Sequence, residues 1–194
     1  MSRPMRRARM LIAGAWALSA TLSLAACSSF PEGPASIGAD YPSSGIQTSV
    51  GWLSDWIEGF VGESEAVGGP IVGLRLEYVE DAWVWRIRSL DPGTDALGQR
   101  PRESTRGREA LVDARTLELV NQREVELSEA ELAELHVGPY EAAQLSGEAY
   151  PSPRMVGLEL AIVDDRPAWK ITTYDTETDA MSVTSIDASS TPAE

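Results

Sequence analysis

The chain contains two stretches in which large apolar and polar residues alternate in the same order. Residues 73–90 read GLRLEYVEDAWVWRIRSL and residues 157–174 read GLELAIVDDRPAWKITTY, and seven of the eighteen aligned positions are identical. Alternation with a period of two predicts β-strands that have one buried face. In the middle of each stretch an acidic pair, Glu80–Asp81 or Asp164–Asp165, stands where a hairpin needs polar turn residues. We therefore expect two β-hairpins whose inner faces are alike.

Helical patterns precede both hairpins. Aromatic residues recur every four positions in residues 49–63, which places them on one stripe of a helix. Residues 128–131 (SEAE) fit a capping box that begins a short helix, and residues 140–149 fit a second helix after the break at Gly138–Pro139. The predicted order of elements therefore places a helix before each hairpin.

Further strands are expected after each hairpin. Residues 91–108 read as a long polar loop, and residues 111–114 then form a third strand with an extended continuation to residue 125. After the second hairpin, residues 181–188 form a strand. The two strands end alike, in Val-Asp-Ala and Ile-Asp-Ala.

The shared order of elements indicates a duplicated unit, with a coincidence of spacing as the alternative. The predicted fold class is α+β, with two repeats of a helix packed on a small antiparallel sheet. The first repeat covers residues 47–127, and residues 128–194 hold a connecting helix, the second repeat and a short tail. The sequence leaves open whether the two sheets lie side by side or join edge to edge around one core.

The order of helix, hairpin and final strand resembles the PepSY domain over residues 47–125 and 138–190. In that family a helix packs across a small antiparallel sheet, and the last strand commonly reads Val-Asp-x-x-Thr-Gly. Residues 112–117 read VDARTL, without the glycine, and residues 186–191 read IDASST. The resemblance implies a module without catalytic residues that restrains peptidases or controls their local activity.

The first 26 residues have the layout of a secretory signal peptide. Four arginines precede residues 10–26, which carry no charge, and this stretch runs into Leu24, Ala25, Ala26 and Cys27. These four residues resemble the bacterial lipobox, which implies cleavage before Cys27 and lipid attached to its sulfur. An uncleaved membrane-spanning anchor is the alternative, although seventeen residues are at the short limit for a span. We expect a lipid-anchored protein on the extracytoplasmic face of the cell membrane.

Residues 27–46 are interpreted as the lipid anchor and a flexible linker, because proline, glycine and serine dominate them. Without the first 26 residues the chain holds 12 basic against 30 acidic residues, a net formal charge of −18. A surface this acidic repels phosphate backbones, so nucleic acid is excluded as a partner.

Four arginines stand close together in this acidic chain. A local positive patch can dock an acidic partner, whereas the alternative is that the arginines pair with acids of their own domain. The candidate docking patch consists of Arg100, Arg102, Arg106 and Arg108.

Few residues suit catalysis or metal binding. His136 is the only histidine and Cys27 the only cysteine, so neither a histidine-based triad nor a metal cluster is expected. Residues 175–180 (DTETDA) begin like a calcium loop, but Ala180 stands where the sharp bend needs glycine. We expect no catalytic residue, no cofactor and no bound metal.

The predicted function is a non-catalytic binding module that engages a protein partner, with a peptidase as the partner that the PepSY resemblance implies. Two alternatives stay open. One is an envelope hydrolase that uses surface carboxylates for acid catalysis. The other is a purely structural envelope lipoprotein with no specific ligand.

Overall fold

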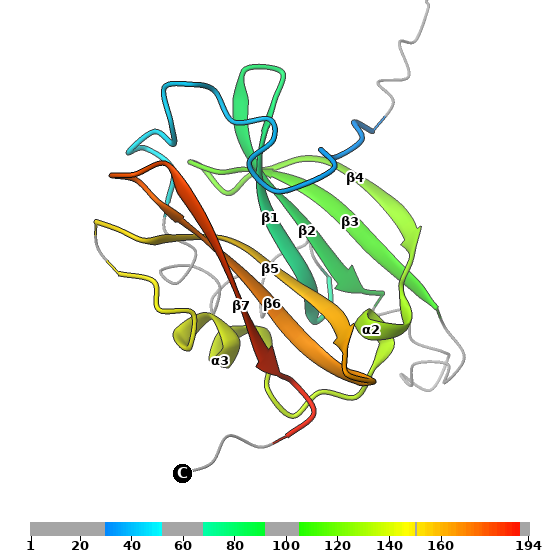
Figure 1. The fold of residues 1–194 in the computed structure, drawn as a ribbon. Coiled ribbons are helices and arrows are strands. Elements are labelled where there is room, and N and C mark those ends of the chain that lie inside the picture. Colours follow the sequence, from blue (N-terminus) through cyan, green and yellow to red (C-terminus); the bar gives the residue numbers. More distant parts are fainter. Residues whose placement is uncertain (1–29, 52–67, 92–104, 150, 191–194) are drawn as a thin grey trace, which may run out of the picture.

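The computed structural model describes residues 30–51, 68–91, 105–149 and 151–190. All strands in these ranges belong to one antiparallel sheet with the order β4-β3-β2-β1-β5-β6-β7 (Figure 1). The strands are β1 (Ile71–Val79), β2 (Ala82–Leu90), β3 (Arg106–Asp113), β4 (Leu119–Glu126), β5 (Arg154–Val163), β6 (Arg166–Asp175) and β7 (Ala180–Asp187). Two helices, α2 (Glu129–Leu132) and α3 (Pro139–Gln144), lie between β4 and β5 in the chain.

The expected fold class, two repeats of a helix packed on a small sheet, is wrong. Both hairpins belong to a single seven-stranded sheet, and the two helices of the described ranges have only four and six residues. The helix expected at residues 140–149 ends early, and Gly147 then adopts a φ of 77°, which glycine tolerates and a helix does not. The other expected helix, at residues 49–63, falls almost entirely outside the described residues.

The two hairpins join edge to edge through their first strands. Leu74 of β1 lies opposite Leu158 of β5, with Gly73 opposite Glu159 and Arg75 opposite Gly157. Leu74 and Leu158 are equivalent positions of the two similar stretches, and their neighbours pair crosswise. This is the pairing that a local two-fold axis between the two leucines produces. Of the two arrangements that the sequence left open, the structure has the one with a shared sheet.

The two predicted hairpins are confirmed, and they have the same register. Leu76 pairs with Trp85 in the first hairpin, and Leu160 pairs with Trp169 in the second. The turn residues 80–81 and 164–165 all have positive φ angles between 48° and 66°, which is the backbone of a two-residue type I′ turn. The acidic pairs therefore serve the turns, as their position in the sequence indicates.

A single hydrophobic core contains the inner faces of both hairpins. The side chains of Leu74, Leu158, Trp85 and Trp169 are at most 1% exposed. The indole Nε1 of Trp169 donates a hydrogen bond to the carbonyl oxygen of Val137, 2.8 Å away, and this bond ties the connection between α2 and α3 to the core. No helix of the described ranges is both long and apolar enough to cross a membrane.

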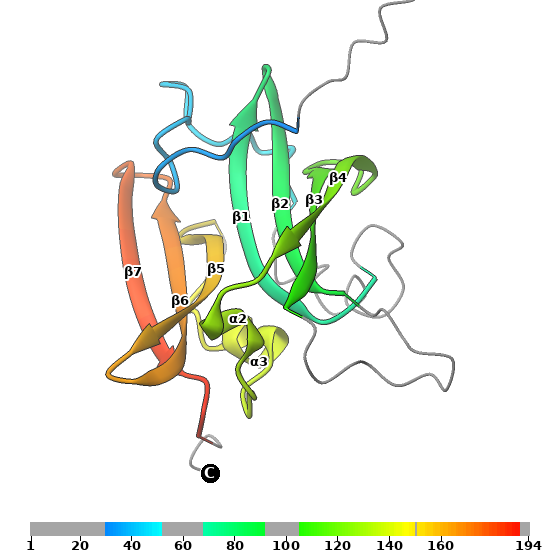
Figure 2. The same cartoon turned by 90° about the vertical axis from the view of Figure 1, so that its right-hand side faces the viewer.

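Residues 30–51, called the N-terminal segment below, lie against the sheet. Figure 2 shows residues 30–51 passing from the β1–β2 side of the molecule to the β7 side. The hydroxyl of Tyr41 donates to the carbonyl oxygen of Leu76, 3.1 Å away, and Nη2 of Arg86 donates to that of Pro31, 2.9 Å away. The flexible linker expected at residues 27–46 therefore differs from the structure from Phe30 onward. The proline- and glycine-rich composition predicts flexibility. It carries no signal for the hydrogen bonds that the carbonyl groups of this segment accept from the sheet.

We expect Leu158→Ala to lower the free energy of unfolding by about 3 kcal/mol, because the side chain is fully buried at the seam and its removal leaves a cavity. The control is Ile162→Ala on the same strand, where the residue is 44% exposed. This change should lower the free energy of unfolding by less than about 1 kcal/mol. Urea unfolding followed by tryptophan fluorescence measures both. If the two hairpins share one core, Leu158→Ala gives a single unfolding transition that moves to lower urea concentration. Two transitions, of which only one moves, would contradict a shared core.

Candidate functional site

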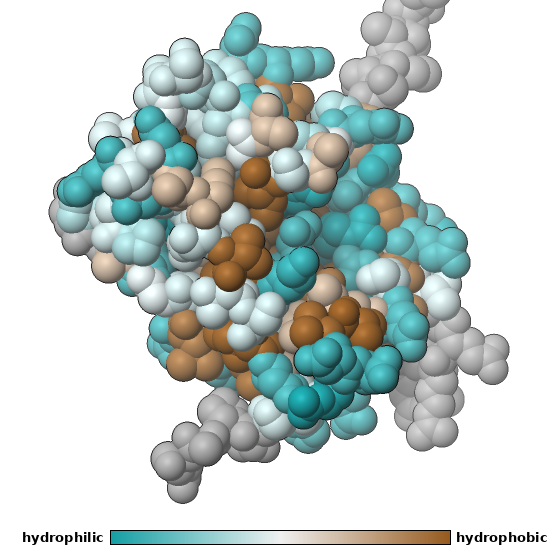
Figure 3. Space-filling model, in the orientation of Figure 1, coloured by the Kyte–Doolittle hydropathy of each residue, from teal (hydrophilic) through white to brown (hydrophobic). Residues whose placement is uncertain are grey.

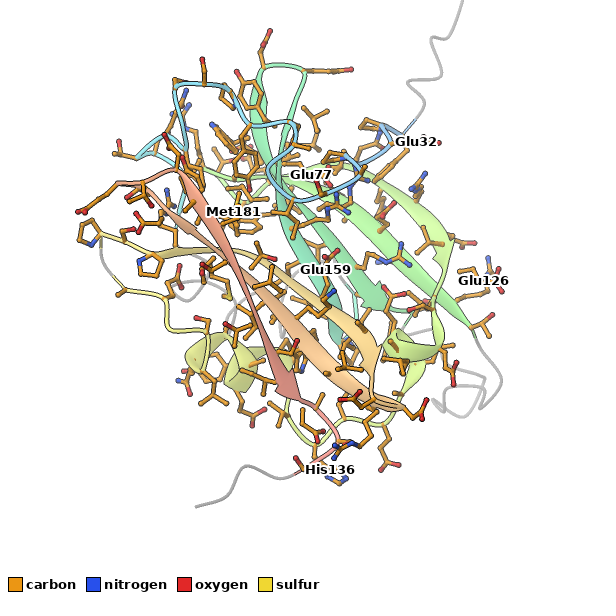
Figure 4. All side chains as sticks on the ribbon, viewed as in Figure 1. Glu32, Glu77, Glu126, His136, Glu159 and Met181 are labelled. Atoms are coloured by element: carbon orange, nitrogen blue, oxygen red, sulfur yellow. The ribbon has the colours of Figure 1, made fainter. Side chains whose placement is uncertain are left out.

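Charged residues replace apolar ones on the sheet face that the N-terminal segment covers. Glu77 of β1, Arg86 of β2 and Glu109 of β3 are at most 3% exposed. Nε and Nη2 of Arg86 each donate to a different carboxylate oxygen of Glu77, both at 2.8 Å, which makes a bidentate pair. Nη1 of Arg86 lies 3.5 Å from the Glu109 carboxylate. Figure 4 shows Glu77 beneath the N-terminal segment.

A second row of ion pairs surrounds this buried pair. Nε of Arg123 donates to the Glu109 carboxylate at 2.6 Å, and Nη1 of Arg88 donates to its other oxygen at 3.3 Å. Arg88 also binds Glu131, with 2.5 Å between Nε and Oε1 and 3.1 Å between Nη2 and Oε2. The network therefore links the four strands β1 to β4 to the helix α2.

Helix α2 positions Glu131 through its own N-terminal cap. Ser128 and Glu131 form the predicted capping box, in which each side chain accepts a hydrogen bond from the other residue's backbone N–H. Burial raises the pKa of Glu131, but hydrogen bonds from Arg88 and Ser128 outweigh burial, so the pKa lies below its ordinary value. Glu131 therefore stays ionised and holds α2 against the sheet.

A cleft of about 270 Å³ opens at the seam between the two hairpins. Its charged lining combines the network with the seam and consists of Arg75, Arg86, Arg88, Glu109, Glu131 and Glu159. Figure 3 shows hydrophilic residues in the middle of this face, between apolar residues over β7 and others near α2, and Figure 4 places Glu159 there.

The mouth of the cleft carries side chains that are partly exposed. The side chains of Arg75, Arg88 and Glu159 are 20%, 27% and 42% exposed. Nη1 of Arg75 lies 3.8 Å from the Glu159 carboxylate, which is a weak pair at this exposure. Burial raises the pKa of Glu159, and Arg75 and Lys170 oppose this only in part.

Two buried guanidinium nitrogens in this cleft lack a hydrogen-bond acceptor among the described residues. They are Nη1 of Arg86 and Nε of Arg75. Each has a carboxylate nearby, Glu109 at 3.5 Å and Glu77 at 3.0 Å, without hydrogen-bond geometry. Both nitrogens are buried, so they hold the charge of the cleft floor and are not open to a ligand.

The predicted docking patch is described only in part. Arg106 and Arg108 lie on β3 and not in a loop, and the exposed Arg106 pairs with Glu124 on β4. This pairing fits the alternative in which the arginines bind acids of their own domain. Arg100 and Arg102 lie outside the described residues, as do Leu24, Ala25, Ala26 and Cys27, so lipid attachment stays a prediction.

The remaining candidates from the sequence stand apart from the cleft. His136 is exposed, and Asp164 and Asp165 occupy the β5–β6 turn. The carboxylate of Asp175 accepts hydrogen bonds from the N–H groups of residues 177 and 178, which closes a turn. Within the described ranges, no three or more histidine, cysteine, aspartate or glutamate residues are grouped so that they could hold a metal ion.

Sequence reasoning missed the cleft because its residues were read as the solvent face of strands. Residues 106–108 (RGR) were assigned to the end of a polar loop, although they begin β3. One signal could have found the network: both hairpin strands place charges of opposite sign on the same face, at Glu77 and at Arg86. Charges on such a face need further hydrogen-bond partners if they are buried, and the carbonyl oxygens of the N-terminal segment provide them.

Comparisons with known proteins assign no family. No family description matches the sequence, and no curated protein matches it. One similar solved structure is the crystal structure of a "putative lipoprotein" from Clostridium difficile 630, which is 16% identical over 72% of this chain and 96% of that chain, with a TM-score of 0.35. Similarity at this level establishes neither the fold nor the function of this chain. The PepSY resemblance finds no support here, and the fold it implied is wrong.

We expect Glu131→Gln to lower the free energy of unfolding by about 2 kcal/mol at pH 7, because Arg88 and Ser128 bind the charged carboxylate. The pKa of Glu131 is lowered by folding, so its stabilisation is present above the unfolded pKa of about 4.3 and is lost as the pH falls through the lower folded pKa.

The matched control is Glu129→Gln, an exposed position in the first turn of the same helix. Urea unfolding at pH 7 and near pH 3 measures both variants. The cost of Glu131→Gln should shrink in acid while that of Glu129→Gln stays small throughout. A cost of Glu131→Gln that is equal at both pH values would contradict the role of its charge.

Proposed function

We propose that this chain is a lipid-anchored extracytoplasmic module that binds a protein partner and has no catalytic role. The observation that supports the binding site is the cleft at the seam, where two guanidinium groups and the Glu159 carboxylate are partly exposed above a fully buried ion pair. The lipobox at residues 24–27 supports the anchor.

The size of the cleft favours a protein partner over a small-molecule ligand. A volume of about 270 Å³ is at the small end of the range of small-molecule sites, which begins near 300 Å³. It suits one or two side chains from a partner's surface. Because Arg75 and Arg88 stand beside Glu131 and Glu159, the partner must present both an acidic and a basic group, and such mixed charge favours specificity.

The network explains why the site suits binding. Each guanidinium group at the mouth is held by carboxylates or by backbone: Arg88 by Glu131, and Arg75 by the carbonyl oxygen of Pro34. Side chains that are held before a partner arrives lose little conformational entropy on binding. A peptidase as that partner followed only from the PepSY resemblance and is not part of this proposal.

A second candidate function is acid-catalysed hydrolysis in the same cleft. Glu159 and Glu131 both line it, and their surroundings move their pKa values in opposite directions. Two carboxyl groups in one cleft whose pKa values are moved apart are the arrangement that acid–base catalysis uses. A hydrolase screen distinguishes the two functions: turnover that is lost in Glu159→Gln would favour the enzyme, and the binding module predicts no turnover.

The binding proposal predicts that Glu159→Lys loses the partner. The full-length chain, expressed in a bacterium and purified with its anchor, is used to capture proteins from envelope extract, and the captured proteins are compared with those of the variant. Glu159 has only a weak pair with Arg75, so the substitution changes the charge of the cleft and leaves the buried pair intact.

Glu177→Lys is the control, because it makes the same change of charge at an exposed turn outside the cleft. A partner that the wild-type chain and Glu177→Lys both capture and Glu159→Lys does not is expected. Equal capture by all three chains would show that binding uses another surface.

A further inference from the structure

The first residue that the structure describes, Phe30, lies three positions after Cys27 in the sequence. Phe30 packs its ring against the guanidinium groups of Arg123 and Arg86, with 4.4 Å and 5.2 Å between the ring centre and the guanidinium carbons. The next residue is tied by the hydrogen bond from Arg86 to the Pro31 carbonyl oxygen. Only Ser28 and Ser29 separate Cys27 from Phe30, so the two α-carbons can lie at most about 11 Å apart.

Apolar side chains line part of the surface next to Pro31. A hollow of about 260 Å³ lies next to Pro31, and Val79, Ala82, Leu111 and Val120 line it. Val120 is 60% exposed, and its neighbour Leu119 is 43% exposed. Large aliphatic side chains that are exposed within reach of a lipid anchor suit the boundary between lipid headgroups and acyl chains.

We propose that the β4 edge around Val120, together with the hollow beside Pro31, is the surface that rests on the lipid bilayer. This orientation rests on the proposed lipid anchor at Cys27. The occupant is a bilayer surface because the short stretch of chain between Cys27 and Phe30 keeps the lipid close to this edge.

Charge limits how deeply this edge enters the membrane. Glu80 and Asp113 line the same hollow, so anionic lipids repel it, whereas Arg123 lies nearby beside Phe30. The anchor and the aliphatic side chains therefore hold the β4 edge against a surface of neutral lipids. The edge enters the bilayer no deeper than the boundary between headgroups and acyl chains.

This orientation has a consequence for the partner. Strands β4 and β7 form opposite edges of the sheet, so β7 is held away from the bilayer when β4 rests on it. The short connection keeps the seam cleft within one domain's width of the membrane. A partner that reaches the cleft must therefore be attached to the membrane or come close to it.

The test uses the complete lipidated chain in vesicles of phosphatidylcholine. Val120→Cys on β4 and Val183→Cys on β7 each receive an environment-sensitive fluorophore, since the sulfur of Cys27 is occupied by lipid. The two valines are matched, because each is 60% exposed and lies on an edge strand. Some of the phospholipids carry a nitroxide quencher near the start of the acyl chain, and mass spectrometry determines the N-terminal modification.

The orientation predicts quenching at position 120 that is several-fold stronger than at position 183. Insertion of a long Gly/Ser segment between Ser29 and Phe30 should remove most of this difference. A lipidated chain that is quenched equally at both positions overturns the orientation and leaves the anchor standing. A chain without lipid on Cys27 that does not bind vesicles overturns both.

Discussion

The bidentate ion pair between Glu77 and Arg86 is the interaction on which the rest of this structure depends. Removing two charges from water is costly, and the pair is stable only when further hydrogen bonds satisfy both partners. The carbonyl oxygen of Pro31 accepts one bond from Arg86, and the Glu109 carboxylate lies on its other side. The buried pair therefore requires both β3 and the N-terminal segment. Its hydrogen bond to Pro31 makes a segment with the composition of a linker part of the fold.

The two halves of the sheet share their apolar core but not this ionic layer. At the positions equivalent to Glu77, Arg86 and Arg88, the second hairpin has Ala161, Lys170 and Thr172. The local two-fold relation at the Leu74–Leu158 seam is thus a relation of packing alone. The cleft forms where the charged half meets the half without the network, and its lining draws on both, with Glu159 as the charged residue from the second hairpin.

The sequence predicted those features that depend on neighbouring residues. The two hairpins, their acidic turns, the capping box at Ser128 and the strand after the second hairpin follow from local periodicity and turn chemistry, and the structure contains them. The predicted fold class failed because the joining of two hairpins through β1 and β5 depends on contacts between residues far apart in the chain. The start of β3 and the cleft were missed because alternating charge reads as exposure, and only tertiary pairing buries Glu109.

The burial of the Glu77–Arg86 pair can be tested most directly by a double-mutant cycle, with Glu77→Leu, Arg86→Met and the double variant compared by urea unfolding at pH 7. Each single variant leaves one buried charge without its partner and is expected to lower the free energy of unfolding by about 3–5 kcal/mol. The double variant replaces the pair by apolar side chains and should cost less than either single change. Single costs below about 1 kcal/mol that add up in the double variant are typical of an exposed pair and would contradict the account.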